Sequence, residues 1–216
     1  MKKHIICFGD SNTHGYCADP ADCAGGGDRF NEEERWTCLL QKQLGEDYLV
    51  LEEGLSGRTT VFPDPTEENL AGSDVIYSVM KSHEPVDLLI IMLGTNDTKV
   101  FLGQNAVSIT LGMERLVKKA MKMDFWADQP NVLVIAPPHV RMELRQHEFY
   151  GFMGENAITE SKALAPHYEA LCRRLGCHFL DAQNVAEFNR VDGMHLTNRG
   201  HSQLAQALAQ LVPTLV

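Results

Sequence analysis

The sequence predicts an α/β fold: a three-layer α/β/α sandwich in which five parallel β-strands form one sheet between two layers of helices. Apolar segments alternate with amphipathic helical segments about five times along the 216 residues, which is typical of a parallel sheet with right-handed crossovers. One segment, residues 86–93, is almost entirely aliphatic, as strands buried on both faces are. We expect the flavodoxin-like strand order 2-1-3-4-5 in a single domain over residues 1–216.

The first half of the chain predicts two strand–helix units followed by a third strand. Gly45 ends the first long helix after a stripe of apolar residues on one face, and Pro85 ends the second. Thr66 is a candidate N-cap for the second helix, which begins there or at Ser73. The expected elements are, in order, a strand at residues 4–8, a loop at 17–34, a helix at 35–44, a strand at 48–52, a helix ending near residue 81 and the strand at 86–93.

The second half continues the same alternation. Apolar residues at helical spacing predict a helix, and Pro137 with Pro138 ends the β-rich run that follows it. The expected elements are, in order, a helix at residues 105–123, a strand at 132–136, an irregular segment at 139–156, a helix at 157–175, a strand at 177–180 and a closing helix at 197–211.

Composition and charge argue against two kinds of partner. The net charge of −10 and the pI of about 5.3 leave no basic patch for nucleic acid or an anionic membrane surface. The longest apolar stretch, around residues 88–93, is far shorter than the ~20 residues of a membrane span. The N-terminal apolar run ends at a candidate nucleophile, so we interpret it as a strand and not a signal peptide, and we expect a cytoplasmic protein.

The six cysteines include no Cys-x-x-Cys pair. In a cytoplasmic protein we expect them to be reduced thiols. Zinc held by Cys17, Cys23 and His14 is a weak alternative, because zinc ligands usually come in two closely spaced pairs. We therefore expect neither a metal nor a cofactor.

Three residues at the two ends of the chain carry the main chemical signal. Ser11 directly follows the first predicted strand, and Asp192 and His195 stand three residues apart near the C-terminus. A serine hydroxyl needs a base to remove its proton; His195 is the candidate base, and Asp192 would hold its other ring nitrogen. The Gly-x-Ser-x-Gly elbow of α/β-hydrolases is absent, because position 13 is threonine.

The predicted sheet brings these residues together. Parallel strands place their carboxyl ends at one edge, which is where open α/β sheets bind ligands. Polar segments containing Ser11, Gly57 and Asn96 each follow a predicted strand, and His195 lies in the loop before the last helix. Each residue alone is also explained by a turn, a helix cap or a structural histidine, whereas the ordered set favours one site.

These segments together resemble the SGNH (GDSL-type) hydrolases, a family named for a serine, a glycine, an asparagine and a histidine in four sequence blocks. Ser11, Gly57, Asn96 and His195 fall on those positions in the same order. The resemblance runs from residue 5 to about residue 200. It is strongest to the short bacterial arylesterase and acyltransferase (perhydrolase) branch, through Cys-Phe-Gly-Asp-Ser, Glu-Glu-Gly-Leu-Ser-Gly-Arg-Thr-Thr and Ile-Ile-Met-Leu-Gly-Thr-Asn-Asp-Thr-Lys.

The resemblance implies an oxyanion hole formed by the backbone N–H groups of Ser11 and Gly57 and the side-chain amide of Asn96. Asn12 stands where the family usually has the leucine of Gly-Asp-Ser-Leu. His14 and Tyr16 stand where acyltransferase relatives have aromatic residues that narrow the approach to the nucleophile. This departure favours hydrolysis over acyl transfer.

Several neighbouring side chains are candidates for supporting roles. Asp10, Asn12 and His14 flank the nucleophile and are candidates to line a substrate pocket. For Asp10 and Asp97, hydrogen bonding to loop backbone is the simpler interpretation. We expect Arg58 to anchor loops through a salt bridge.

Two long loops, residues 17–35 and 139–155, are candidates to shape specificity. The second carries an apolar group that could cover the acyl pocket or form a subunit contact: Phe149, Tyr150, Phe152 and Met153. We favour the subunit contact and a homo-oligomer, because relatives in the branch it resembles are oligomeric.

The leading hypothesis is a metal-independent serine esterase that hydrolyses small esters of short, acetyl-like acids through an acyl-enzyme on Ser11. Carbohydrate O-deacetylation and acyl transfer to an alcohol or peroxide are alternatives at the same site. A non-catalytic flavodoxin-like binding module is a remote alternative, because the sequence has neither a Gly-x-Gly-x-x-Gly fingerprint nor a P-loop.

Overall fold

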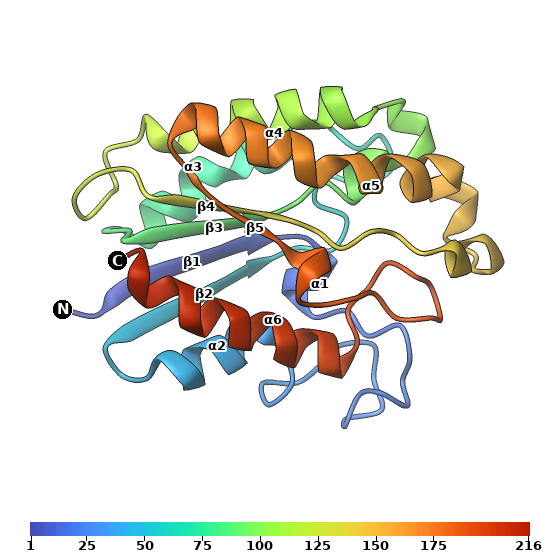
Figure 1. Ribbon diagram of the computed structural model, residues 1–216, viewed down its shortest axis with the longest axis horizontal. Helices are drawn as coiled ribbons and strands as arrows, with labels where there is room; N and C mark the ends of the chain where they lie inside the picture. The colour runs from blue at the N-terminus through green and yellow to red at the C-terminus, as the bar shows by residue number, and fades with distance from the viewer.

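The computed structural model describes residues 1–216 and contains one five-stranded sheet in the order β2-β1-β3-β4-β5 (Figure 1). Every neighbouring pair of strands is parallel. The strands are β1 (Lys3–Gly9), β2 (Tyr48–Gly54), β3 (Leu88–Met92), β4 (Val132–Ala136) and β5 (His178–Asp181). The predicted fold class and strand order are confirmed.

Helices cover both faces of the sheet (Figure 1). On one face lie α2 (Trp36–Leu44) and α6 (Asn198–Leu211), which pack against each other. On the other lie α3 (Gly72–Ser82), α4 (Ala106–Met121) and α5 (Tyr150–Leu175). The short helix α1 (Ser11–His14) follows β1, and single 3-10 turns occupy Asn96–Thr98, Val100–Leu102, Met142–Gln146, Ala182–Asn184 and Val212–Thr214.

Two hydrophobic clusters, one on each side of the sheet, hold these layers together. Along β1 the side chains alternate, so that Ile5 and Cys7 pack beneath α2 and α6 while Ile6 and Phe8 pack toward the opposite helices. All five residues of β3 are buried, which explains the unbroken aliphatic pattern of this central strand. Burying one such side chain contributes roughly 1.5–3 kcal/mol.

The carboxyl ends of the strands form the edge that carries the polar segments. In Figure 1 the arrowheads of β1 and β2 point toward α1, and both chain termini lie at the opposite end of the sheet. The loops after β1, β2 and β3 therefore lie side by side there, at Gly9, Gly54 and Met92.

The segment 139–156, predicted to be irregular, is largely helical. A 3-10 turn spans Met142–Gln146, and α5 begins at Tyr150. Gly154 interrupts this helix with a non-helical backbone (φ 61°, ψ −169°). Because the break changes the direction in which side chains point, residues 150–156 show no single helical period that the sequence pattern could reveal.

Helix α3 begins at Gly72, within one residue of the alternative start at Ser73 and not at Thr66. Thr66 instead donates its N–H and hydroxyl to the side chain of Asp64. The one-turn helix α1 was not predicted, because four residues are too few to display a period.

None of the helices combines the length with the apolar composition needed to cross a bilayer. All six cysteines are free. Cys17 and Cys23 pack with Phe30 in a small cluster of their own within the loop at residues 17–35.

Candidate active site

The turn between β1 and α1 presents Ser11 at the first position of the helix. Asp10 is the N-cap, and its carboxylate accepts the backbone N–H of Asn12 at 2.9 Å. The turn packs closely on β2: a Cβ atom at Gly54 would lie 2.1 Å from the backbone nitrogen of His14. Glycine at position 54 therefore allows the helix to sit against the sheet edge.

Ser11, His195 and Asp192 form one hydrogen-bonded chain. The Nε2 atom of His195 lies 2.8 Å from Ser11 Oγ, and its Nδ1 atom lies 2.6 Å from Asp192 Oδ2. All three residues are buried. The sheet thus joins a serine and a histidine that are 184 positions apart in the sequence.

The loop around Asp192 keeps its carboxylate ionised. Burial alone would raise the pKa of Asp192, but the contact with His195 and the backbone N–H groups of Met194 and His195 outweigh it and lower the pKa to about 2. The anion can therefore accept the Nδ1 proton of His195 and stabilise the imidazolium when the ring gains a second proton.

Two asparagines, Asn189 and Asn12, hold the loop that carries Asp192 and His195, and neither was predicted from the sequence to do so. The side chain of Asn189 accepts the N–H of Asp192 at 3.0 Å and donates to Asp192 Oδ1 at 3.0 Å. Its amide also donates to the backbone oxygen of His195 at 2.8 Å. An asparagine three residues before an Asp-Gly turn is a signal for such an Asx-type loop.

Asn12 connects the nucleophile turn to the same loop. Its amide donates to the backbone oxygen of Met194 at 3.2 Å and accepts the N–H of Leu196 at 2.9 Å. These two residues flank His195, so one side chain fixes the spacing between Ser11 and the imidazole.

Gly57 and Asn96 lie beside Ser11 at the ends of β2 and β3. Gly57 has a left-handed backbone (φ +84°), and a Cβ there would come within 2.9 Å of the side chain of Leu70. Its backbone N–H has no acceptor in the chain. The Asn96 amide donates to the backbone oxygen of Arg58 at 3.2 Å and makes a longer contact of 3.4 Å with Asp10.

Two buried carboxylates lie behind these donors. Asp97 accepts the backbone N–H of Thr60 at 3.0 Å and also its hydroxyl, and so ties the loops after β2 and β3 together. Burial raises the pKa of Asp97 and of Asp10 to about 6 in each case. Hydrogen bonding of both side chains to loop backbone matches the simpler interpretation offered for them above.

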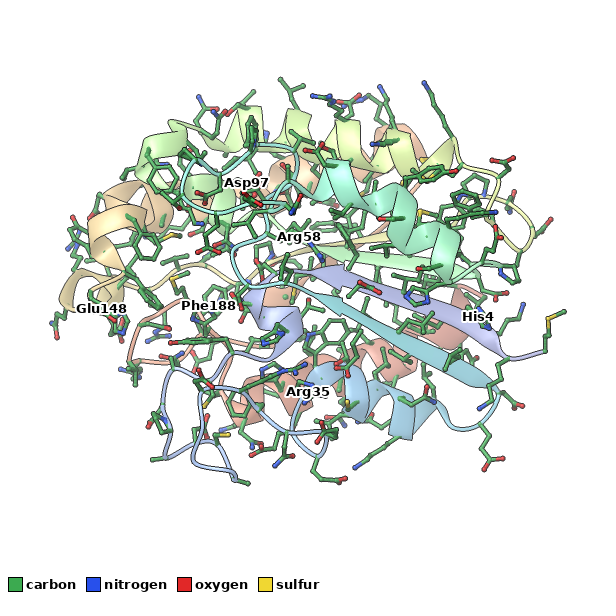
Figure 2. All side chains as sticks on the ribbon, turned by 180° about the vertical axis from the view of Figure 1, so that it is seen from behind. His4, Arg35, Arg58, Asp97, Glu148 and Phe188 are labelled. Atoms are coloured by element: carbon green, nitrogen blue, oxygen red, sulfur yellow. The ribbon has the colours of Figure 1, made fainter.

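Arg58 is buried between the same loops (Figure 2). It donates to the backbone oxygens of Gly9, at 2.9 Å, and Glu53, and its guanidinium stacks over the ring of Phe8 at 4.2 Å. Burial lowers its pKa to about 10. Backbone carbonyls, and not the expected salt bridge, anchor this side chain.

A cavity of about 310 Å³ opens beside Ser11. One wall is largely aromatic: the ring of Tyr16 lies 4.5 Å from that of His195, and Phe149 lies 6.3 Å from both. The rest of the lining includes polar and charged side chains. The full lining is Ser11, Tyr16, Ser56, Gly57, Glu67, Asn96, Lys99, Phe149, Phe152, Met194 and His195.

The lining differs from one expectation and agrees with one of two alternatives. Asp10, Asn12 and His14 were candidates for the pocket but lie outside it, because Asp10 and Asn12 are committed to the hydrogen bonds above and His14 packs toward Gly54. Phe149 and Phe152 line this cavity, as one of the two interpretations offered for them expected, and Met153 is in the core. The favoured interpretation, a subunit contact, stays a prediction.

A larger cavity of about 530 Å³ lies at the other end of the sheet, near Lys3, Asp87 and His178. None of the hydrogen-bonded groups described above reaches it. The candidate catalytic groups therefore gather at the carboxyl edge, where the Ser11 hydroxyl lies within hydrogen-bond distance of His195 and beside candidate oxyanion donors.

Comparison with known proteins supports the same assignment. Residues 7–203 match the GDSL-like lipase/acylhydrolase family. The fold is similar to the aryl esterase of M. smegmatis, with a TM-score of 0.88 and 38% identity, covering 99% of this chain and 100% of that one. A search of curated proteins gave no match.

Two further solved structures are similar over nearly the whole chain. A carbohydrate acetylesterase from Sinorhizobium meliloti has a TM-score of 0.88 and 35% identity, covering 100% of both chains. A putative arylesterase from Agrobacterium tumefaciens has a TM-score of 0.84 and 33% identity, covering 99% of this chain and 100% of that one.

Proposed function

The chain belongs to the GDSL-like lipase/acylhydrolase family, and from that premise we propose that it is a serine esterase that hydrolyses esters of short, acetyl-like acids through an acyl-enzyme on Ser11. The observation that carries this proposal is the unbroken hydrogen-bonded chain from Ser11 through His195 to Asp192, of which Ser11 and His195 line the cavity.

In the first step, His195 Nε2 removes the hydroxyl proton as Ser11 Oγ attacks the ester carbonyl. The 2.8 Å contact between these atoms requires no rearrangement before the transfer. The positive charge on the imidazole is stabilised by the ionised carboxylate of Asp192, 2.6 Å away.

The negative oxygen of the tetrahedral intermediate needs donors aimed at it. The backbone N–H groups of Ser11 and Gly57 and the amide of Asn96 surround the nucleophile and fit this role. The long 3.4 Å contact between Asn96 and Asp10 is the one that a substrate oxygen would replace. Each such donor typically contributes about 100- to 1000-fold to the rate.

The intermediate collapses when His195 returns the proton to the leaving alcohol. A water molecule then attacks the acyl-enzyme, with His195 as base for a second time, and releases the acid and free Ser11. Because the leaving oxygen must lie beside His195, the leaving group lies along the wall formed by Tyr16 and Phe149.

An aromatic wall next to the leaving group suits planar aryl alcohols and the flat apolar face of a sugar ring. Carbohydrate O-deacetylation is therefore the second candidate. It is favoured by the similarity, at 34% and 35% identity, to two structures described as carbohydrate acetylesterases.

Purified protein should hydrolyse p-nitrophenyl acetate faster than longer-chain esters, with chelator present. Ser11→Ala should abolish this activity, whereas Ser78→Ala, on the exposed surface of α3, should keep it. Equal turnover by Ser11→Ala and the wild type would contradict the mechanism. A parallel series of aryl acetates and acetylated sugars separates the two candidate substrate classes.

The expected cytoplasmic location and homo-oligomeric state stay predictions. Sedimentation velocity at several protein concentrations measures the latter directly.

A further inference from the structure

Lys99 is a buried cation with unused donors. Its side chain is only 7% exposed, and its ammonium group donates to one partner, Asp64 Oδ2, at 2.6 Å. An ammonium group carries three N–H donors, so two of them have no hydrogen-bond acceptor in the protein. The ring of Phe101, with its centroid 5.9 Å from Nζ, is the only other group that the cation faces. Since Lys99 lines the cavity beside Ser11, a bound molecule is the available acceptor.

The ion pair is built into the structure. The side chain of Asp64 is fully buried and also accepts the N–H and hydroxyl of Thr66. Burial opposes ionisation of Asp64, but the hydrogen bonds from Lys99 and Thr66 outweigh it and lower its pKa. Asp64 therefore fixes the position of the Lys99 ammonium group.

Lys99 lies next to the candidate oxyanion hole. A Cβ atom built on Gly57 would lie 3.8 Å from Lys99 Nζ. The leaving group of an ester must face His195, whose neighbours are Tyr16 and Phe149. With the leaving group at His195 and the carbonyl oxygen at Gly57 and Asn96, the acyl substituent lies against the rest of the lining, which includes Lys99.

The charged residues of the cavity lining determine which kind of oxygen Lys99 can bind. Asp64 neutralises Lys99, and Glu67 adds a negative charge to the same cavity lining. A carboxylate on the acyl group would meet two negative charges for one positive charge. An uncharged oxygen can accept a hydrogen bond from Lys99 without that repulsion.

We propose that Lys99, fixed by Asp64, is a specificity residue that binds an uncharged oxygen in a short acyl group, as in alkoxyacyl, hydroxyacyl or ketoacyl esters. This inference rests on the proposed esterase function and names the acyl class that the site prefers. Hydrocarbon acyl groups of the same length leave the two donors unpaired and are poorer substrates.

The test compares two esters that differ in one atom. In p-nitrophenyl methoxyacetate an oxygen replaces one methylene of p-nitrophenyl butyrate, so size and leaving group are the same. The quantity measured is the ratio of kcat/KM for the two esters. Comparing this ratio between enzyme variants cancels the different intrinsic reactivity of the esters.

The main variant is the double substitution Lys99→Met with Asp64→Asn, which removes the donors without leaving a buried carboxylate unpaired. The methoxyacetate-to-butyrate ratio should fall about tenfold, because a hydrogen bond from a charged donor is lost. Glu67→Gln keeps the donors and should leave the ratio within about twofold of wild type. If the double variant does not fold, Lys99→Gln, whose amide can still donate to Asp64, should lower the ratio in the same direction.

An unchanged ratio in the Lys99 variants overturns the proposal, as does an equal fall in Glu67→Gln. A p-nitrophenyl hemisuccinate that is cleaved better than both esters by the wild type overturns the assignment of an uncharged acyl group. Failure of the wild type to cleave any of these esters, or equal cleavage by Ser11→Ala, instead overturns the proposed esterase function.

Discussion

Replacing Asn12 by leucine should disable the site without touching a reacting group. The amide of Asn12 is 2% exposed and bridges the nucleophile turn to the backbone on both sides of His195, at Met194 O and Leu196 N. Leucine keeps the volume but makes neither bond. The imidazole then loses its direct tie to the turn that carries Ser11.

The size of the effect follows from these two bonds. Leaving two buried backbone groups unpaired costs about 1–3 kcal/mol each, so the free energy of unfolding should fall by about 2–4 kcal/mol once the protein relaxes. Catalysis is more sensitive, because a displacement of about 1 Å can cost about 100-fold in rate. We expect kcat to fall about 10- to 100-fold with KM nearly unchanged.

The assay is steady-state hydrolysis of p-nitrophenyl acetate at a temperature where urea titration shows the variant folded. Asn131→Leu is the matched control: the Asn131 side chain also bridges two backbone groups, here the oxygens of Asp87 at 3.0 Å and Leu215 at 2.8 Å, but at the far end of the sheet. It should lose stability and keep kcat. Wild-type kcat in Asn12→Leu, or an equal loss of kcat in Asn131→Leu, would show that Asn12 does not position His195 for catalysis.

Three further predictions concern the oxyanion donor, the acid of the triad and the buried carboxylates. Asn96→Ala should lower kcat by about 100- to 1000-fold, measured by the same assay, and a loss below tenfold would remove the amide from the oxyanion hole. Asp192→Asn should lower kcat by about 10⁴-fold while circular dichroism stays that of the wild type; retained activity would show that His195 needs no anion. Burial raises the pKa of Asp97 from 3.8 to about 6, so the folded state binds more protons than the unfolded state and its stability is lost as pH rises through about 6. Between pH 4 and pH 7 the wild type should lose about 2 kcal/mol of unfolding free energy relative to Asp97→Asn in urea titrations, and parallel pH profiles would contradict this sign.

The fold could be predicted from the sequence because the residue patterns that indicate its strands and helices are local. Leu88–Met92 and Val132–Ala136 are short aliphatic runs bounded by glycine or proline, and each is a strand of the sheet within two residues of its predicted ends. The N-terminal part of α5 was not accessible, because the backbone break at Gly154 divides it into pieces too short to show a period.

The positions of the catalytic candidates followed from topology, since each lies at the carboxyl end of a parallel strand or in the loop before α6. The contacts that hold these residues in place could not be predicted from topology. Asn12 acts through residues 182 and 184 positions away, and Lys99 pairs with Asp64 across 35 positions. Such partners depend on how loops pack against one another, which neither residue spacing nor helical period encodes.

The aromatic wall of the pocket also could not be predicted from local sequence patterns. Phe149 and Phe152 formed an apolar group whose partner the sequence did not identify, and subunit contact was the favoured interpretation. Their place beside His195 depends on the course of the chain from β4 into α5, where the 3-10 turn Met142–Gln146 and the start of α5 direct them into the cavity.

Covalent labelling with a fluorophosphonate followed by peptide mapping shows directly whether Ser11 is a nucleophile activated by His195. We expect one adduct per chain, located on Ser11, absent in Ser11→Ala and formed far more slowly in His195→Ala. An adduct on another residue, or undiminished labelling of Ser11→Ala, would contradict this assignment.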